Sequence, residues 1–237
     1  MTRGTLRSRV RRVALLAALA WLVLTVTPVL LLRWIPPATS AFMLEARLRA
    51  ARAGERRYRT GYRWVSLERI SPEAALAVIA SEDQTFPFNY GFDLGSIREA
   101  VRAAERGKRL RGASTITQQV AKNLFLWPGR SFVRKGVEAY LTVLIELLWP
   151  KERILEVYLN IAQFGHGIFG VEAAARSFYH EPAVRLSSAQ AARLAAVLPD
   201  PVHWHVERPS RFVLWREHWI LGQMRNLGGP AYLRAAR

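Results

Sequence analysis

The sequence predicts a mainly α-helical protein that begins with one membrane-spanning helix. Three observations carry this prediction: one long uncharged hydrophobic segment near the N-terminus, a series of segments with apolar residues at helical spacing, and a scarcity of alternating strand patterns. The chain has 237 residues, of which 51% are hydrophobic, enough to bury a sizeable core. This length predicts one globular domain with a short appendage.

The hydrophobic segment covers residues 13–32, a run without any charged residue that is framed by arginines at both ends. As an α-helix, a segment of this length is long enough to cross one bilayer. A cleaved secretory signal is the alternative, but its apolar core is usually about 7–15 residues long and precedes a small-residue cleavage site. We therefore expect an uncleaved transmembrane helix over residues 13–33, after a cytoplasmic tail over residues 1–12.

The charge distribution predicts the orientation of this anchor and the nature of its partner. Residues 1–12 contain five arginines and no acidic residue, which places the N-terminus in the cytoplasm. The rest of the chain holds 30 Lys and Arg against 18 Asp and Glu, a difference of +12 within a total of +17. For a domain tethered outside the membrane, this charge indicates an anionic, membrane-borne partner rather than a nucleic acid. A merely solubilising basic surface is the alternative.

A linker over residues 34–69 separates the anchor from the main domain in this prediction. Within it, residues 45–63 hold seven Arg and two Glu, a pattern that fits either a juxtamembrane helix and turn lying on lipid headgroups or a solvated linker. No internal repeat or low-complexity tract follows. Residues 70–237 therefore read as one domain.

Helix signals dominate this domain. Ser71 is a suitable N-cap, and Pro72 occupies the first position of a helix that continues to about Asp83. The best strand candidate is the short segment 60–67. Apolar periodicity and stop signals predict the further helices, which cover residues 93–106, 115–125, 131–148, 151–160, 171–178, 188–197 and 211–225.

Glu82 and Asp83 end the first of these helices and precede the apolar stretch Phe86–Phe88. A carboxylate beside aromatic groups is partly desolvated, which raises its proton affinity and suits it to act as a general base. The alternative is an exposed acidic pair at a helix end, although negative charge there opposes the helix macrodipole.

Two further helices carry polar groups that suit a sugar or a phosphate. In the helix 115–125, polar and basic side chains recur at intervals of three and four residues on one side, and a hydrated face is the alternative. In the helix 131–148, two cations lie close to Glu138, and ordinary surface ion pairs are the alternative. Together these cations could hold a pyrophosphate. The residues of the two sets are Thr115, Gln118, Gln119, Lys122, Arg130, Arg134 and Lys135.

Several other classes of site lack support. The chain has no cysteine, which excludes disulfides, Cys-ligated zinc and thiol nucleophiles. Its five histidines do not form a recognised metal-binding pattern, and we predict no metal site. No GxSxG turn, Walker loop or dinucleotide fingerprint is present, so serine hydrolysis, ATP chemistry and nicotinamide chemistry lose their usual support.

Four segments follow one another along the chain: ASEDQTFPFNYGFD at 80–93, GASTITQQVAKNLF at 112–125, RSFVRKGVEAYLTVLIE at 130–146 and KERILEVYLNIAQFG at 151–165. In this order they resemble four successive motifs of the peptidoglycan glycosyltransferases, glycosyltransferase family 51, and residues 173–201 resemble the fifth. Only 36 residues follow Pro201, and we expect no transpeptidase domain. The chain is therefore similar to the monofunctional, membrane-anchored members of this family, the biosynthetic transglycosylases.

The resemblance implies a lysozyme-like, two-lobed helical fold and an enzyme that joins lipid II units into β-1,4 glycan strands. In this reaction the anomeric centre is inverted and undecaprenyl pyrophosphate leaves. Glu82 would be the base that deprotonates the acceptor hydroxyl, and Glu138 would orient cations and substrate. A structural role is expected for Glu152, Glu156 and Asn160. The implied substrate-binding residues are Asp83, Ser114, Thr115, Gln118, Gln119, Lys122, Arg130, Arg134 and Lys135.

One position departs from the family pattern, because Asn89 stands where the first motif commonly has a histidine. Asparagine can form hydrogen bonds but cannot shuttle a proton, so any acid–base duty of that histidine does not transfer to this chain.

The resemblance also implies the surroundings of the enzyme. Its partners would be lipid II, the growing glycan, the bilayer and proteins of cell wall synthesis or division, with no nucleic acid. No cofactor is required, although Mg²⁺ or Mn²⁺ could assist the pyrophosphate. The anchor would lie in the inner membrane with the catalytic domain in the periplasm. The alternatives are a lysozyme-like lytic hydrolase of peptidoglycan and a non-enzymatic scaffold that binds anionic lipid.

Overall fold

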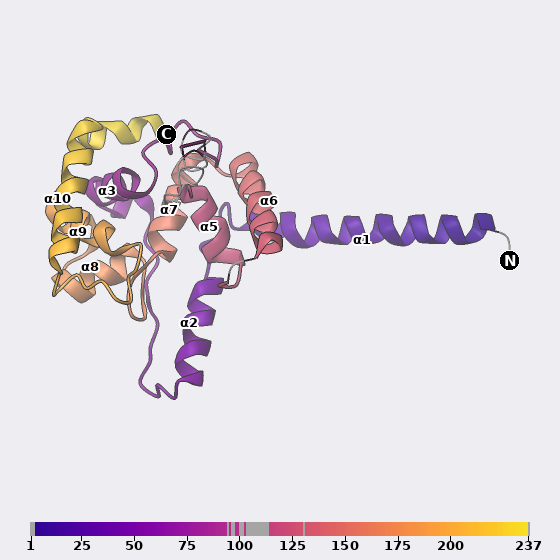
Figure 1. Ribbon diagram of the computed structural model, residues 1–237, viewed down its shortest axis with the longest axis horizontal. Helices are drawn as coiled ribbons and strands as arrows, with labels where there is room; N and C mark the ends of the chain where they lie inside the picture. Colours follow the sequence, from indigo (N-terminus) through magenta and orange to yellow (C-terminus); the bar gives the residue numbers. More distant parts are fainter. Residues whose placement is uncertain are drawn as a thin grey trace.

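The computed structural model describes residues 3–93, 95, 98, 99, 102, 114–129 and 131–236. Within this part the elements are mostly helices with one small sheet, which confirms the prediction of a mainly α protein. The helices form two lobes at the end of one long N-terminal helix (Figure 1). The predicted helix 93–106 falls mostly outside the described residues.

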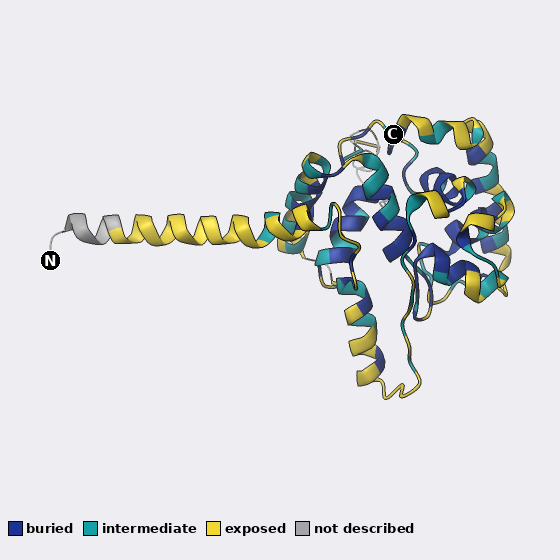
Figure 2. Cartoon of the chain, turned by 180° about the vertical axis from the view of Figure 1, so that it is seen from behind, coloured by how far each residue is buried: buried dark blue, intermediate teal, exposed yellow. Residues whose placement is uncertain are grey.

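Each lobe is a separate packing of helices (Figure 1). The first lobe contains α3 (Pro72–Glu82), α8 (Val171–Tyr179), α9 (Ser188–Val197) and α10 (Arg211–Asn226). The second contains α5 (Ile116–Phe125), α6 (Phe132–Leu148) and α7 (Lys151–Ile161), with α2 (Ala41–Arg52) packed against α5. Buried residues fill the interior of both lobes (Figure 2).

The long helix α1 (Arg3–Leu31) begins ten residues before the predicted transmembrane helix 13–33 and ends two residues before its predicted end. Its portion Arg9–Leu31 is long and apolar enough to cross a membrane, and only 6% of its most apolar window is buried (Figure 2). The end of α1 nearest the lobes packs against α6. There the indole of Trp149 donates a hydrogen bond to the carbonyl oxygen of Val29 at 2.7 Å.

The sheet has three short strands in the order β1–β3–β2. β1 (Gly61–Tyr62) pairs in parallel with β3 (Ile168–Phe169), which pairs antiparallel with β2 (Gln163–Gly165). The predicted strand 60–67 was wrong in extent, because only two of its residues are in β1. Further along it, the backbone N–H and C=O of Val65 bond the side-chain amide of Asn160, each at 2.9 Å, instead of a neighbouring strand.

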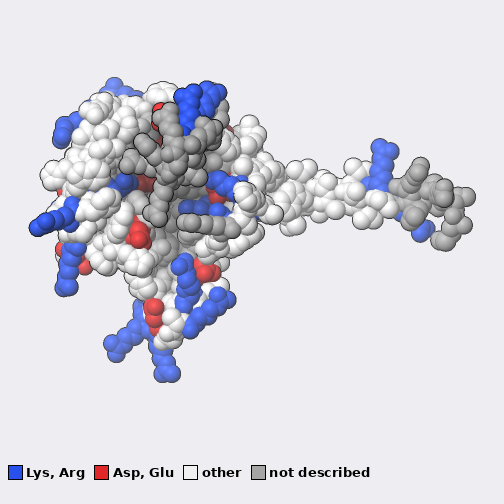
Figure 3. All heavy atoms as spheres, in the orientation of Figure 1, with Lys and Arg blue, Asp and Glu red and all other residues white. Residues whose placement is uncertain are grey.

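The juxtamembrane helix starts earlier than the charge pattern indicated. α2 begins at Ala41, because the hydroxyl of Ser40 accepts the backbone N–H of Met43 at 3.2 Å, and Met43 itself is fully buried. α2 projects from the body of the protein and carries exposed arginines, which stand out as blue atoms at its tip (Figure 3). The domain boundary at residue 70 stays a prediction.

Helix boundaries elsewhere follow from caps that the sequence contains. Thr115 with Gln118, and Ser187 with Gln190, form capping boxes that begin α5 and α9. Three short 3₁₀ helices complete the described elements: Leu67–Arg69, Ala183–Arg185 and Gly229–Ala236.

Helix α6 buries a carboxylate beside the apolar residues Leu141 and Ile145 and leaves other apolar residues exposed. Its charged arc faces inward, with Glu138 only 2% exposed, whereas Phe132, Val133 and Leu147 on the opposite arc are 98%, 75% and 75% exposed. The alternative of ordinary surface ion pairs on this helix is therefore wrong. An exposed apolar arc of this size indicates contact with another apolar phase.

Candidate active site

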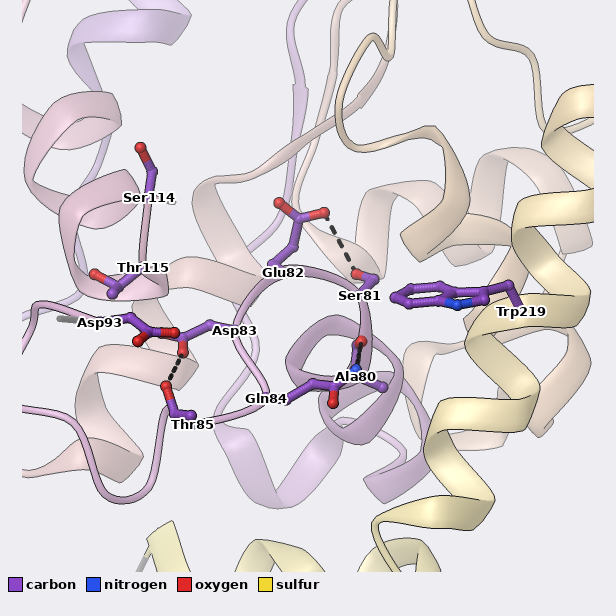
Figure 4. A pocket seen from close by; sticks show the side chains of 10 residues that line it. All are labelled: Ala80, Ser81, Glu82, Asp83, Gln84, Thr85, Asp93, Ser114, Thr115 and Trp219. Atoms are coloured by element: carbon purple, nitrogen blue, oxygen red, sulfur yellow. Dashed lines mark hydrogen bonds between the residues drawn. The ribbon is translucent and has the colours of Figure 1, made fainter. Parts of the chain in front are cut away.

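Glu82 is the last residue of α3, and its side chain projects between the two lobes (Figure 4). One carboxylate oxygen, Oε2, accepts a hydrogen bond from Nε2 of Gln119 on α5 at 3.0 Å. The other, Oε1, accepts from Nη2 of Arg216 on α10 at 3.2 Å. The carboxylate is therefore oriented from both lobes at once, while 14% of its side chain stays exposed.

The side-chain amide of Gln119 is itself oriented by a hydrogen bond from α7. The hydroxyl of Tyr158 on α7 donates to Oε1 of Gln119 at 3.1 Å, which fixes the amide so that its N–H₂ group points to Glu82. Burial raises the pKa of Tyr158 well above its ordinary value, so this hydroxyl keeps its proton and remains a donor. Sequence reasoning gave Tyr158 no role.

The predicted cations gather around Glu138. Its two oxygens accept hydrogen bonds from Nη1 of Arg134 at 3.1 Å and from Nζ of Lys135 at 2.5 Å. Burial lowers the pKa of Lys122; the charges of Glu138 and Glu82 act on it in the opposite direction. Lys122 thus lies within electrostatic reach of both glutamates, and it links the cation cluster to Glu82.

Two arginines in this region have an unused donor. Among the described residues, the Nε groups of Arg134 and Arg216 are buried and have no hydrogen-bond acceptor. A buried donor without a partner costs about 1–3 kcal/mol, so such groups mark places where an acceptor from a ligand is expected. Arg130, the remaining predicted cation, lies outside the described residues.

Asp83 supports the site from inside the protein. It is 6% exposed, and its Oδ2 accepts the backbone N–H of Ile116 at the start of α5 at 3.0 Å. Its Oδ1 accepts from Asn89 at 2.8 Å and from Thr85 at 3.2 Å. Burial raises the pKa of Asp83, and these hydrogen bonds oppose the shift. These contacts join the end of α3 to the start of α5.

Asn89, the departure from the family pattern, belongs to the same network. Its amide nitrogen donates to Asp83, and its Oδ1 accepts from the backbone N–H of Gly91 at 3.1 Å and from Nζ of Lys151 at 3.3 Å. Lys151 also bonds Glu146 at 2.8 Å. At this position the amide serves as a structural connector, a task that needs no proton transfer.

The polar residues predicted at the start of α5 have different surroundings. Thr115 and Gln118 are buried, and their side chains form the capping box, while the Thr115 hydroxyl donates to the carbonyl of Gly91 at 2.7 Å. Ser114 is exposed beside them. From this stripe only Gln119 and Lys122 reach toward the charged groups described above. The substrate-binding assignments stay predictions.

A cavity of about 330 Å³ opens beside Glu82 (Figure 4). Its walls come from the end of α3, the start of α5 and the ring of Trp219 on α10. The lining residues are Ala80, Ser81, Glu82, Asp83, Gln84, Thr85, Asp93, Ser114, Thr115 and Trp219.

Sequence reasoning missed both residues that α10 contributes, Arg216 and Trp219. The signal that could have found them is the segment FVLWREHW, where an arginine lies among aromatic residues at helical spacing. In the fourth motif, the contacts of Asn160 with Val65 and of Glu156 with the backbone N–H of Leu67 are structural, as expected. Within the described part of the chain, no three His, Asp or Glu side chains lie close enough together to hold a metal ion.

Comparison with known proteins decides the family. A family model described as "Transglycosylase" matches residues 49–225. The chain belongs to the transglycosylase family. Several matching proteins are named "Biosynthetic peptidoglycan transglycosylase". The protein from Cronobacter sakazakii is 53% identical over 98% of this chain and 96% of its own length. The protein from Chromohalobacter salexigens is 53% identical over 98% of this chain and 99% of its own length. A third protein of this name, from Xylella fastidiosa, is 48% identical over 92% of this chain and 90% of its own length. These matches confirm the resemblance seen in the motifs and the prediction that this transglycosylase is a glycosyl-transferring enzyme.

Proposed function

We propose that this transglycosylase polymerises lipid II into β-1,4-linked glycan strands for the cell wall. The observation that carries the proposal is the position of Glu82, whose carboxylate is held by Gln119 and Arg216 and lies within electrostatic reach of Lys122. Transfer from a sugar pyrophosphate to a sugar hydroxyl requires a base for the hydroxyl and cations for the pyrophosphate.

In the proposed reaction, Glu82 takes the proton from the 4-hydroxyl of the acceptor sugar. The freed oxygen attacks the anomeric carbon of the donor, and the bond from that carbon to the pyrophosphate breaks. The electron pair of that bond leaves with the pyrophosphate, and the α linkage of the donor becomes a β linkage. Gln119 and Arg216 contribute by holding the carboxylate in one orientation, because each bonds a different oxygen.

Neutralisation of the departing pyrophosphate is the task of the cations. Arg134 and Lys135 bond the buried Glu138, which fixes their positions, and Lys122 lies within electrostatic reach of the same carboxylate. The unpartnered Nε of Arg134 offers a donor that an incoming phosphate oxygen would satisfy. Because charge neutralisation makes the pyrophosphate a good leaving group, a second carboxylic acid to protonate it is not required.

We further propose that the cation cluster lies at the membrane surface on the periplasmic side of the inner membrane. The exposed apolar arc of α6 and the adjoining α1 would contact the bilayer, and the arginine-rich residues 3–12 would remain in the cytoplasm. Lipid II, the growing glycan and the membrane are then the partners, with proteins of cell wall synthesis or division as further candidates.

The absence of cysteine allows a direct test of this topology, because a single introduced cysteine is the only thiol. In intact spheroplasts, Glu207→Cys in the exposed loop before α10 should react with a membrane-impermeant maleimide. Ser8→Cys in the N-terminal segment should react only after the membrane is permeabilised. The reverse pattern would contradict the proposed orientation.

The activity is tested with purified full-length enzyme and lipid II in detergent or vesicles. The wild type should form polymer, and Glu82→Gln should reduce the rate by about 10²- to 10⁴-fold, the usual contribution of a general base. The matched control is Glu207→Gln, which changes an exposed glutamate far from Glu82 in the sequence and should behave as the wild type. Degradation of preformed glycan without polymer formation would instead support a lytic hydrolase. If Glu82→Gln kept full activity, the assigned base would be wrong.

We propose that the reaction needs no resident cofactor, with Mg²⁺ or Mn²⁺ assisting the pyrophosphate as the alternative. Polymerisation measured with a chelator, and again after Mg²⁺ is restored, distinguishes these cases. Unchanged activity in the chelator supports a cation set supplied by the protein alone.

A further inference from the structure

The face of α10 that carries Arg216 also carries a row of exposed aromatic rings. Phe212, Trp215 and Trp219 follow one another at intervals of three and four residues and therefore share one face of the helix. They are 50%, 60% and 39% exposed. Trp204 extends the row, since its ring centroid lies 5.1 Å from that of Phe212, which lies 5.7 Å from that of Trp215. Other residues of α10 supply the core of the lobe, and the row is free to bind.

The row begins in the cavity of Glu82. Trp219 forms one wall of this cavity, and the other described lining groups are carboxylates, hydroxyls, an amide and a small apolar side chain, with no Lys or Arg among them (Figure 4). Glu82 is paired with Arg216, and the hydroxyl, amide and carboxylate groups of the lining can exchange hydrogen bonds with sugar hydroxyls. An aromatic wall with a few polar groups is typical of a site for a neutral polar ligand.

The position of α10 shows which sugars can reach the row. α10 lies on the side of the molecule away from α1, whereas the cation cluster belongs to the lobe that contacts α1 (Figure 1). A donor whose pyrophosphate is held at that cluster has its lipid tail directed to the bilayer and its sugars on the other side of the pyrophosphate. The sugars added in earlier cycles are the part of the substrate that extends farthest from the membrane. This location also distinguishes the row from the Trp belts of membrane interfaces.

We infer that Trp219, Trp215 and Phe212 form a track that binds sugar rings of the elongating glycan strand between transfers. The C–H groups on the face of a pyranose ring pack against the negative face of an aromatic ring. From residue 212 to residue 219 the helix rises about 10 Å, which gives room for successive rings. A strand held on this track stays bound while its new pyrophosphate moves to the cations, so synthesis becomes processive.

The inference rests on the proposed polymerase function, and the test separates the two. Polymer length is measured by gel electrophoresis for the full-length wild type, Trp215→Ala and Phe212→Ala/Trp215→Ala. Binding of a soluble β-1,4-linked N-acetylglucosamine hexamer is measured by calorimetry, which requires no turnover. His218→Ala, an exposed residue of α10 outside the row, is the matched control. Trp215→Phe retains an aromatic ring, and thermal melts check that each variant is folded.

We expect the alanine variants to make chains several-fold shorter and to bind the hexamer roughly tenfold more weakly, as loss of an aromatic contact predicts. Trp215→Phe and the His218 variant should stay close to the wild type. If the wild type makes no polymer, the proposed function itself fails. If it makes polymer and the alanine variants match it in chain length and hexamer affinity, the track is refuted.

Discussion

The guanidinium of Arg216 lies 3.2 Å from the carboxylate of Glu82, although 134 positions separate the two residues in the chain. Both side chains are largely buried, at 18% and 14% exposure. The contact ties the C-terminal helix α10 to the end of α3 at the point where the acceptor hydroxyl is expected to be deprotonated. Arg216 is thus a positioning residue for the base.

Replacing Arg216 should slow the chemical step more than it weakens substrate binding. Arg216→Ala removes the only charged group among the described side chains that bond the Glu82 carboxylate, and we expect kcat to fall by about 10- to 100-fold with a smaller change in KM. Arg216→Lys keeps the charge and should recover part of kcat. Steady-state kinetics with lipid II measure the effects on kcat and on KM separately. A change confined to KM would show that the arginine acts on substrate binding instead.

The lowered pKa of Lys122 predicts the alkaline limit of activity. Burial is the main cause, so the ammonium form is present below the lowered pKa and is lost as pH rises through it, before an ordinary lysine at 10.5 would lose its proton. Arginine remains charged throughout this range. In pH–rate profiles, Lys122→Arg should therefore retain activity to higher pH than the wild type, with circular dichroism at each pH excluding unfolding. If the wild type and Lys122→Arg lost activity at the same alkaline pH, the proposed role of Lys122 would be contradicted.

Loss of the Asp83 carboxylate should destabilise the junction of α3 and α5. In Asp83→Asn one oxygen becomes a donor, and either Ile116 or Asn89 loses its acceptor, which costs about 1–3 kcal/mol of unfolding free energy. Denaturant unfolding measures the loss. Asp200→Asn, at an exposed ion pair with His203, is the control and should change stability by less than about 1 kcal/mol.

The same residue predicts a pH dependence of stability. Burial raises the folded pKa of Asp83 above its ordinary value of 3.8, so its contribution to stability is complete below that value and is lost as pH rises through the raised pKa. Asp83→Asn removes this dependence. Stability curves of wild type and variant should therefore converge as pH rises, apart from the constant cost of the lost hydrogen bond, and curves that run parallel would contradict the assignment.

The contact between Trp149 and Val29 predicts a measurable coupling of the anchor to the lobes. Trp149→Phe removes the indole donor and should cost about 1 kcal/mol. Hydrogen exchange of the backbone amides that follow Val29 should become faster in the variant. Trp34→Phe, whose indole is 66% exposed, serves as the control. Equal exchange in both variants would show that the hydrogen bond does not hold the helix.

The helices could be predicted because their signals are local. Thr115 with Gln118 specifies a helix start wherever that segment lies, and apolar spacing gives its length. The cation group around Glu138 could likewise be predicted, since its members are neighbours on one helix or the next. The strand at 60–67 could not, because a distant side chain, Asn160, satisfies the backbone of Val65.

Contacts between side chains of different helices could not be predicted from a single sequence. Nothing local in the α10 segment indicates that Arg216 meets Glu82, or that Tyr158 holds the amide that bonds it. The burial of Glu138 on α6 could not be predicted either, because the i, i+4 spacing of Arg134 and Glu138 is also that of an ordinary surface ion pair.

The packing of α1 on α6, and of the residues just after α1 on α7, has a consequence for how substrate is found. Arg153 on α7 bonds the carbonyl oxygens of Leu32 and Ile35 just beyond α1, in addition to the contact made by Trp149. These contacts hold the lobes against the end of the anchor, so in the proposed topology they restrict the height and tilt of the catalytic groove above the lipid. A lipid-linked sugar diffusing in the plane of the leaflet arrives already at the right level, so the search for it is two-dimensional.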